Sequence, residues 1–299
     1  MAAVALIPVD VRARLANLRL RARRGGGGDG LGQHQSRSRG AGLEFAQYRA
    51  YEPGDEPRRI DWKLYARSDR YFVRESERDS PLTLWLVIDA SASMGQADGV
   101  RPSWRKLDAA KAIAACAIEL AVRQGDRFGL VALGTGGSSL IAAHAGPRHR
   151  GRCVLELERL ECGGTWPAEA VLRPMWERVL PSSLVLVLSD FFDESAAELA
   201  LRFAAARREV LTVQMLSAEE RDFPFAGGHR FVDPESASER RVEAAAVRAD
   251  YLERFAAARA RLARRFAASG VRHTEYFLDD VPDLPLRQFF GTAADRGRA

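Results

Sequence analysis

Cysteines, paired-cysteine motifs and long apolar runs are scarce in this sequence. Its 299 residues include three cysteines, Cys116, Cys153 and Cys162, and no CxxC pair, so a zinc site is not expected. An odd number of thiols, without an apolar signal segment at the N-terminus, is typical of a reducing cytoplasm. No stretch approaches the roughly 18 consecutive apolar residues of a membrane helix. We therefore expect a soluble, cytoplasmic protein.

Positive charge is present but is mostly spread along the chain. The formal net charge is +5 and the sequence pI is about 9.4. The cationic side chains are almost all arginine, and Asp and Glu are interleaved with them. A nucleic-acid binder usually concentrates its positive charge. We therefore attribute the high arginine content to the codon bias of a GC-rich genome. The alternative is that the chain is an Arg-rich nucleic-acid-binding protein.

The first 30 residues form a basic segment with a periodic apolar stripe. Val11, Leu15, Leu18 and Ala22 recur at the spacing of one helix face, and six arginines surround them. The predicted helix either packs this stripe on its own domain or binds an acidic partner or a membrane surface. The stretch GGGGDG (25–30) predicts a flexible break after the helix.

Residues 31–81 are polar and turn-rich, which predicts a small β-rich subdomain. Its aromatic residues, expected on strands and tight turns, are Phe45, Tyr48, Tyr51, Trp62, Tyr65, Tyr71 and Phe72. A mixed-charge cluster lies within it and comprises Asp55, Arg58, Arg59, Asp61 and Trp62. We interpret the cluster as a salt-bridge network that fastens the subdomain to the main domain. A partner-binding face is the alternative.

Apolar runs alternate with helical patterns from residue 82 to residue 290, and a tail (291–299) follows. Strands are predicted at 82–88, 127–133, 182–188, 209–216 and 271–278, and helices at 107–125, 151–160, 167–179, 194–208 and 242–269. Continuous apolar strands are typical of parallel sheets, which are buried on both faces. The pattern predicts an α/β fold, with a doubly wound, mostly parallel sheet and helices on both faces.

Two of the predicted strands run directly into an aspartate. LTLWLVI (82–88) precedes Asp89, Ser91 and Ser93, and LVLVLS (184–189) precedes Asp190. Doubly wound sheets bind ligands outside the carboxyl ends of their strands, so we expect Asp89 and Asp190 at the same edge. Two carboxylates at the boundary of a core repel each other, and a divalent cation between them removes that cost.

A third segment, CGGTWP (162–167), adds a further oxygen ligand. Thr165 follows two glycines that permit an unusual loop backbone. Its alternative role is to cap a helix whose first turn contains Pro167. The candidate metal ligands are therefore Asp89, Ser91, Ser93, Thr165 and Asp190. These side chains offer oxygen only, which selects a hard cation, Mg²⁺ first, with Mn²⁺ or Ca²⁺ as alternatives.

Two of these five ligands are anionic, so a coordination position is left for water or for the carboxylate of a partner. We therefore expect a docking site for an Asp or Glu of another protein. The sequence leaves open whether a carboxylate of the chain's own N-terminal segment, for instance Glu44 or Asp55, fills that position.

Motifs of common enzyme classes are absent from the sequence. There is no GxSxG nucleophile elbow, no GxxxxGK[ST] phosphate loop and no GxGxxG after a strand. DASAS (89–93) lacks the second aspartate of aspartyl-phosphate phosphatases. A metal-dependent hydrolase on the same sheet edge is the alternative, because a bound Mg²⁺ can activate water, but no general base is evident. We expect a protein that is not an enzyme.

The order of the three motifs resembles the metal-ion-dependent adhesion site of von Willebrand factor A domains. That site combines Asp-x-Ser-x-Ser after the first strand, a Thr in a Gly-rich loop and an Asp after a later strand. The resemblance implies that Ser91, Ser93 and Thr165 reach the metal directly or nearly so. It also implies that Asp89 and Asp190 often act through water.

The preceding segment is similar to the signature of the bacterial family called domain of unknown function 58. Its matching pieces are GQHQSRSRGAG (32–42), YRAYEPGDEPRRIDW (48–62) and YFVRE (71–75). The resemblance covers roughly residues 10–290. Many members carry two membrane helices before this segment, so this chain resembles the short, soluble form. Members often accompany MoxR-type AAA+ ATPases, which implies a role in protein maturation or remodelling, with the von Willebrand-type domain recognising a client or the ATPase.

Overall fold

The computed structural model describes residues 6–22, 39–52, 55, 57–77, 81–134 and 137–291. The chain forms two compact units, a larger unit of Met1–Gly25 with Leu82–Ala299 and a smaller unit of Gly26–Pro81. The predicted glycine-rich break at 25–30 and the tail beyond Gly291 lie outside the described residues.

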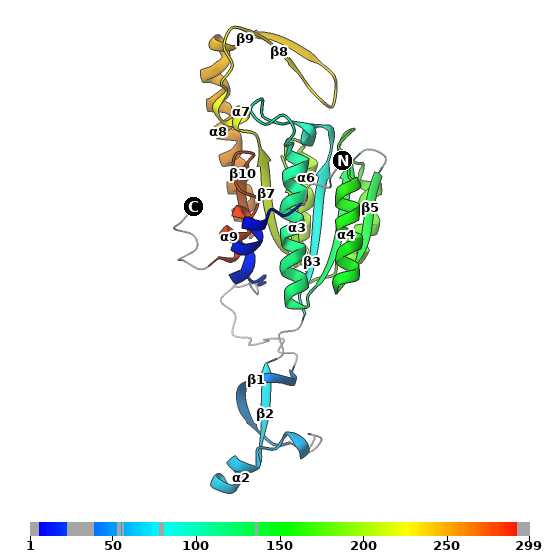
Figure 1. The fold of residues 1–299 in the computed structure, drawn as a ribbon, viewed down its shortest axis with the longest axis vertical. Coiled ribbons are helices and arrows are strands. Elements are labelled where there is room, and N and C mark those ends of the chain that lie inside the picture. Colours follow the sequence, from blue (N-terminus) through cyan, green and yellow to red (C-terminus); the bar gives the residue numbers. More distant parts are fainter. Residues whose placement is uncertain are drawn as a thin grey trace. The chain divides into compact units, whose positions relative to one another are not determined.

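A six-stranded sheet forms the centre of the larger unit, in the order β10-β7-β6-β3-β4-β5 (Figure 1). The strands are β3 (Thr83–Ala90), β4 (Arg127–Gly134), β5 (Gly137–His144), β6 (Leu184–Ser189), β7 (Glu209–Leu216) and β10 (Arg272–Phe277). Neighbouring strands are parallel except for β4 and β5, which are antiparallel. The predicted fold class, α/β with a mostly parallel sheet, is confirmed.

The central strand β3 supplies side chains to a core on each face of the sheet. Leu84, Leu86 and Ile88 belong to one hydrophobic cluster. Trp85 and Val87 belong to the other. Because successive side chains of a strand point to opposite faces, a strand buried on both faces needs an unbroken apolar run. This is the physical reason that LTLWLVI shows no polar alternation.

Helices cover both faces of this sheet (Figure 1). The first core includes buried residues of α1 (Val9–Arg14), α3 (Lys106–Gln124), α4 (Pro147–Arg159) and α9 (Leu284–Phe290). The second includes buried residues of α5 (Glu169–Arg178), α6 (Glu194–Ala205) and α8 (Ala244–Ala268). Over the described part of the chain, no helix combines the length and the apolar character needed to cross a membrane.

The N-terminal stripe packs on its own domain. Val11, Leu15 and Leu18 are buried in the core that contains α3. The Arg123 side chain donates hydrogen bonds to the backbone oxygens of Leu15 and Ala16 and so holds the end of this segment. The alternative interpretation requires an exposed stripe that can bind an acidic partner or a membrane. The buried stripe is not available for such binding. Ala22, which the periodicity included, is exposed.

Several elements differ from the sequence-based expectation. The edge strand β5 and the hairpin of β8 (Gly228–Val232) and β9 (Glu239–Glu243) were not predicted, and α8 begins after β9, at Ala244. Neither hairpin strand contains a buried residue, so neither shows the apolar signal that marks the central strands. Pro167 precedes α5 by two residues, so it does not lie in the first turn of that helix.

The smaller unit pairs β1 (Arg39–Ala50) with β2 (Phe72–Glu77) as antiparallel strands. Between them lies the helix α2 (Trp62–Ser68), where the sequence suggested strands and turns. Its Tyr65 ring stacks on Tyr71 with ring centroids 4.5 Å apart. Trp62 and Tyr65 thus lie on a helix, where the sequence predicted strands and tight turns for the aromatic residues of this region.

Asp61 is the N-cap of α2, and its removal should weaken this helix. Its Oδ1 atom accepts hydrogen bonds from the N–H groups of Lys63 and Leu64, at 3.0 and 3.1 Å. We expect Asp61→Ala to destabilise the smaller unit by about 1 kcal/mol, the usual cost of losing such a cap. Hydrogen exchange of α2 amides measures the change. Asp61→Asn keeps an acceptor and is the control, and a loss of metal affinity in Asp61→Ala would contradict a purely structural role.

Candidate metal centre

Asp89 and Asp190 lie at the carboxyl-terminal edge of the sheet, on neighbouring strands. β3 and β6 are parallel, with Ile88 paired to Leu188. The Ser189 hydroxyl donates a 2.6 Å hydrogen bond to Asp89 Oδ2. Both carboxylates are almost completely buried. In the sheet, β3 lies between β4, the next strand along the chain, and β6, a later strand. The strand order therefore reverses at β3, and doubly wound sheets bind ligands at such a switch point.

Ser91 and Ser93 follow Asp89 in a tight loop that contains the short 3₁₀ helix η3 (Ala92–Gly95). The Ser91 N–H group donates a 2.9 Å hydrogen bond to Asp89 Oδ1. The hydroxyl oxygens of Ser91 and Ser93 are 3.1 Å apart. All three residues are buried. The structure therefore brings the carboxylate and the two hydroxyls of the DxSxS motif together.

The loop that carries Thr165 is joined to the DxSxS loop by two backbone hydrogen bonds. The N–H group of Gly163 donates to the oxygen of Ala90, and that of Ala92 donates to the oxygen of Gly164, each at 2.9 Å. Gly164 has a positive φ of 65°, which a side chain would disfavour. Thr165 follows and is exposed. The N-cap of α5 is Ala168, so Thr165 does not cap that helix.

A buried lysine that the sequence did not single out lies against Asp190. Lys106, the first residue of α3, places its Nζ atom 3.3 Å from Asp190 Oδ2 and 2.7 Å from Glu220 Oε1. The Nζ atom also lies 4.5 Å from the centroid of the Phe192 ring. Glu220 belongs to α7 (Ala218–Asp222), where it forms a capping box with Ser217.

The cluster holds more carboxylates than ammonium groups. Asp190 and Glu220 contact the ammonium of Lys106, and Asp89 lies near enough to Asp190 for their charges to interact. Burial, and then the charge of Asp190, raise the pKa of Asp89 to about 6, while hydrogen bonds from Ser189 and Ser91 oppose the shift. A raised pKa means that the negative charge of Asp89 is poorly compensated. A divalent cation at this edge would supply the missing positive charge.

The residues at this edge fit a hard cation. Carboxylate and hydroxyl oxygens are ligands that Mg²⁺ accepts, and no sulfur or nitrogen ligand is offered by the five predicted residues. In the described ranges, no group of three or more His, Cys, Asp or Glu residues is arranged to hold a metal ion. Hydrogen bonds join Asp89, Ser91 and Ser93, and the loop that carries the exposed Thr165 is attached to this segment through its backbone.

Sequence reasoning missed three residues of this centre: Lys106, Ser189 and Glu220. Lys106 directly precedes the predicted helix, next to Arg105, and carries no motif signal. Glu220 does have a readable signal, because Ser217 and Glu220 have the S-x-x-E spacing of a capping box. Lys106 and Glu220 come close to Asp190 through tertiary contacts between α3, α7 and the end of β6.

Comparison with known proteins places this chain in a family. The model of the family described as "Protein of unknown function DUF58" matches residues 47–261. An uncharacterized protein of Mycobacterium tuberculosis (strain ATCC 25618 / H37Rv) is 29% identical over 235 residues, which cover 77% of this chain and 73% of that protein.

Two solved structures are similar to this chain at low sequence identity. One is an aerotolerance-related membrane protein of Bacteroides fragilis, with a TM-score of 0.44, 14% identity, and coverage of 69% of this chain and 96% of that one. Another is the VWA domain of SpRpn10, with a TM-score of 0.39, 12% identity, and coverage of 70% and 95%. The family match spans well over half of the chain, so this protein belongs to the family of proteins of unknown function DUF58, as the motifs at 48–62 predict.

Proposed function

We propose that this protein is a non-enzymatic interaction module that docks an acidic side chain of a partner through a bound divalent cation, Mg²⁺ first. The proposed ligands are Asp89, Ser91, Ser93, Thr165 and Asp190. The observation that carries the proposal is the convergence of the DxSxS side chains and Asp190 at one switch point of the sheet. Mg²⁺ prefers about six oxygen ligands, so two protein carboxylates and three hydroxyls leave a position for a partner's oxygen.

Binding is better supported than hydrolysis at this edge. A hydrolase needs a group that accepts a proton from the attacking water. The basic side chain that the structure places beside Asp190 is Lys106, which is buried and engaged by two carboxylates. These contacts suit a charge-balancing role for Lys106, and the carboxylates that could accept a proton, Asp89 and Asp190, are those proposed to hold the ion.

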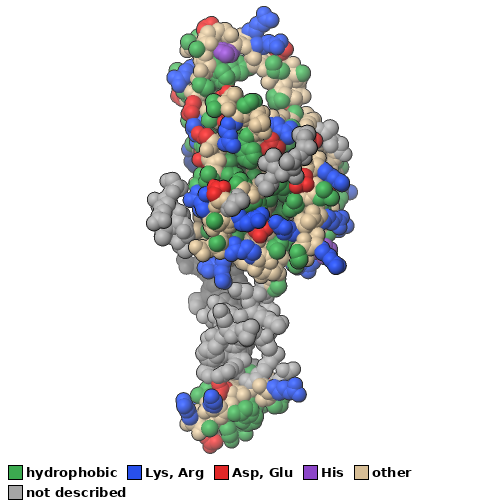
Figure 2. All heavy atoms as spheres, in the orientation of Figure 1, with side chains coloured by type: hydrophobic (Ala, Val, Ile, Leu, Met, Phe, Trp, Pro, Cys, Tyr) green, Lys and Arg blue, Asp and Glu red, His purple; other side chains and the backbone are tan. Residues whose placement is uncertain are grey.

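The surface charge gives little support to a nucleic-acid interface. Figure 2 shows basic side chains scattered over the visible face of the larger unit, with acidic and apolar side chains among them. Several arginines are tied to carboxylates, for example Arg221 to Asp279 and Arg259 to Glu275. A nucleic-acid binder would be expected to gather free positive charge on one face.

The partner that we propose is a MoxR-type AAA+ ATPase or a client protein in a maturation or remodelling reaction in the cytoplasm. This part of the proposal rests on what the resemblance to the family implies, because its members often accompany such ATPases. The chemistry of the site narrows the partner's contribution to an Asp or Glu side chain, because a hard cation with an open position prefers an anionic oxygen.

Calorimetric titration of Mg²⁺ and Mn²⁺ into metal-stripped protein tests the site. We expect the wild type to bind one ion per chain. Asp89→Asn should bind the ion about 10-fold to 100-fold more weakly, which is the usual loss of metal affinity when a carboxylate that orients a metal site is removed. Asparagine keeps the volume of the buried side chain. Glu161→Gln alters an exposed carboxylate in the loop before Thr165 and is the matched control.

The same proteins then test docking. Capture of a MoxR-type ATPase by the wild type should be lost with a chelator and in Asp89→Asn, and should depend only modestly on salt. Absence of ion binding by folded wild type up to millimolar concentration would refute the metal site. Binding to any DNA with a steep dependence on salt would favour the nucleic-acid alternative instead.

A further inference from the structure

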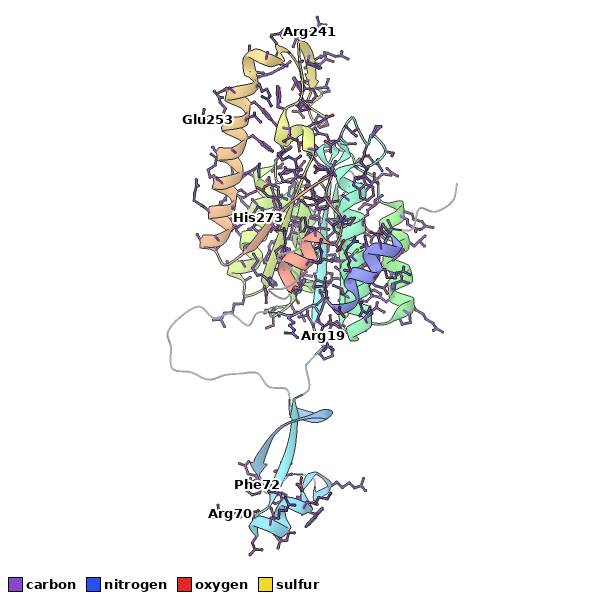
Figure 3. All side chains as sticks on the ribbon, turned by 60° about the vertical axis from the view of Figure 1, so that its left-hand side comes forward. Arg19, Arg70, Phe72, Arg241, Glu253 and His273 are labelled. Atoms are coloured by element: carbon purple, nitrogen blue, oxygen red, sulfur yellow. The ribbon has the colours of Figure 1, made fainter. Side chains whose placement is uncertain are left out.

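A short loop, residues 190–193, joins β6 to α6 at the sheet edge that carries the candidate metal centre. Figure 1 shows the start of α3, α7 and the β8–β9 hairpin at one end of the larger unit. The loop lies at this end, because Lys106 at the start of α3 contacts Asp190. Figure 3 shows Arg241 of β9 at the opposite end of the larger unit from Arg19. The loop is therefore remote from the basic N-terminal segment.

Hydrogen bonds hold this loop along its whole length. The Phe191 N–H group donates to the Ser189 hydroxyl at 2.9 Å. The Phe192 N–H group donates to Asp190 Oδ1 at 3.2 Å, which fixes Phe192 relative to a proposed metal ligand. At the end of the loop, the Asp193 side chain caps α6. The loop therefore has a defined conformation before any partner binds.

The two phenylalanines of the loop lie in opposite environments. Phe191 has a φ of 57°, a left-handed conformation that is uncommon for residues other than glycine. Its ring is buried and contacts the rings of Phe266 and His273, with centroids 5.4 and 6.4 Å apart. Phe192 is instead 52% exposed. The buried ring of Phe191 thus anchors the loop, and the next residue presents its side chain to solvent.

Phe192 differs from the other aromatic residues of the larger unit. In the described ranges of this unit, every other Phe, Tyr or Trp residue is buried or half-buried. The Phe192 ring has one contact inside the protein, because the Nζ atom of the fully buried Lys106 lies 4.5 Å from its centroid. Such an ammonium is attracted to the face of an aromatic ring. Lys106 therefore fixes the orientation of the ring, and about half of Phe192 stays accessible to a partner.

An exposed ring beside a metal centre can select among acidic partners. A bound cation recognises the charge of a carboxylate, which does not distinguish one Asp or Glu of a partner from another. Rigid aromatic side chains supply much of the binding energy at protein interfaces. The charge of the ion and the apolar ring lie side by side here, so they complement a partner that places an apolar side chain next to an acidic one. Burial of that apolar side chain would add affinity that an isolated carboxylate lacks.

We propose that Phe192 determines which acidic partner docks at the centre. The Asp or Glu that completes the metal site is accompanied by a neighbouring aromatic or large aliphatic side chain, which packs on the Phe192 ring. The inference rests on the proposed function. Because the loop and the ring are held in place before binding, little conformational entropy is lost when the partner docks. A partner whose acidic side chain has only polar neighbours should bind more weakly.

Acetate and 3-phenylpropionate, added to the Mn²⁺-loaded protein, test the inference. Each acid should displace water from the bound ion, and the relaxation of water protons then reports its affinity. We expect 3-phenylpropionate to bind the wild type about 10-fold more tightly than acetate, the order expected for packing one aromatic ring on another. The two acids should bind Phe192→Ala equally. Phe192→Leu keeps an apolar cover over Lys106 and should retain part of the preference. The matched control is Leu180→Ala, which removes an exposed apolar side chain before β6, at the other edge of the sheet.

Magnetic resonance of protein with labelled phenylalanine rings gives a second readout, with Mg²⁺ in place of Mn²⁺. 3-Phenylpropionate should shift the ring signal that is missing from Phe192→Leu, and acetate should shift it much less. An unchanged signal, equal affinity of the wild type for the two acids, or a preference that persists in Phe192→Ala would overturn the inference and leave the proposed function standing. Failure of the wild type to bind Mn²⁺, or to bind either acid once Mn²⁺ is bound, would overturn both.

Discussion

Asp283→Asn should destabilise the larger unit by about 3 kcal/mol. Asp283 is fully buried and accepts two hydrogen bonds from Arg14 and one from Arg287, each at 2.9 Å. It thereby fastens α1 and α9 to the same point. Removing one partner of a buried ion pair leaves uncompensated charge, which costs about 3–5 kcal/mol. We place the loss at the low end, because the Arg14 side chain is 35% exposed and keeps some contact with water.

Urea denaturation followed by tryptophan fluorescence measures this loss, since four of the five tryptophans lie in the larger unit. Asparagine has the volume of aspartate, so a change in packing does not account for the effect. The control is Asp10→Asn, which removes the exposed partner of Arg14 and should change stability little. An equal loss in the two variants would show that Asp283 has no special role in joining the two ends of the chain.

Lys106→Met should have the second large effect, and the effect should depend on Mg²⁺. Lys106 is completely buried and compensates Asp190 and Glu220. In the presence of a chelator we expect a loss of about 3–5 kcal/mol, because two buried carboxylates lose their counter-charge. Bound Mg²⁺ should restore part of it, since an ion at 100 times its dissociation constant stabilises the folded state by about 2.7 kcal/mol.

The informative quantity is the gain in stability on adding Mg²⁺, compared between the variant and the wild type. We expect a larger gain in Lys106→Met, because the ammonium no longer repels the ion or shares Asp190 with it. Lys111→Met is the matched control: it removes another buried lysine of α3, whose Nζ atom lies 4.0 Å from Asp108. Its Mg²⁺ gain should equal that of the wild type. Equal gains in all three proteins would argue against an ion next to Asp190.

Local patterns predicted every strand of the six-stranded sheet except the edge strand β5. The strands predicted at 82–88, 182–188 and 209–216 correspond to β3, β6 and β7, because a strand buried on both faces must be apolar throughout. The edge strand β5 and the hairpin β8–β9 escaped prediction. Their residues are small, polar or half-exposed, so no apolar run or strict alternation marks them. The helix α2 was missed for a different reason: Trp62 and Tyr65 favour strands, and the cap at Asp61 decides otherwise.

The sequence by itself determined which side chains stand at the ends of the central strands. Asp89 is the second-last residue of β3, Ser91 and Ser93 follow that strand, and Asp190 follows β6. Parallel pairing was therefore enough to predict that they share an edge. Tertiary structure alone decided what surrounds them. Lys106 and Glu220 come from α3 and α7, far from Asp190 in the chain. Strand-end positions follow from short-range periodicity, whereas the charge balance of a buried site depends on long-range packing that no local pattern encodes.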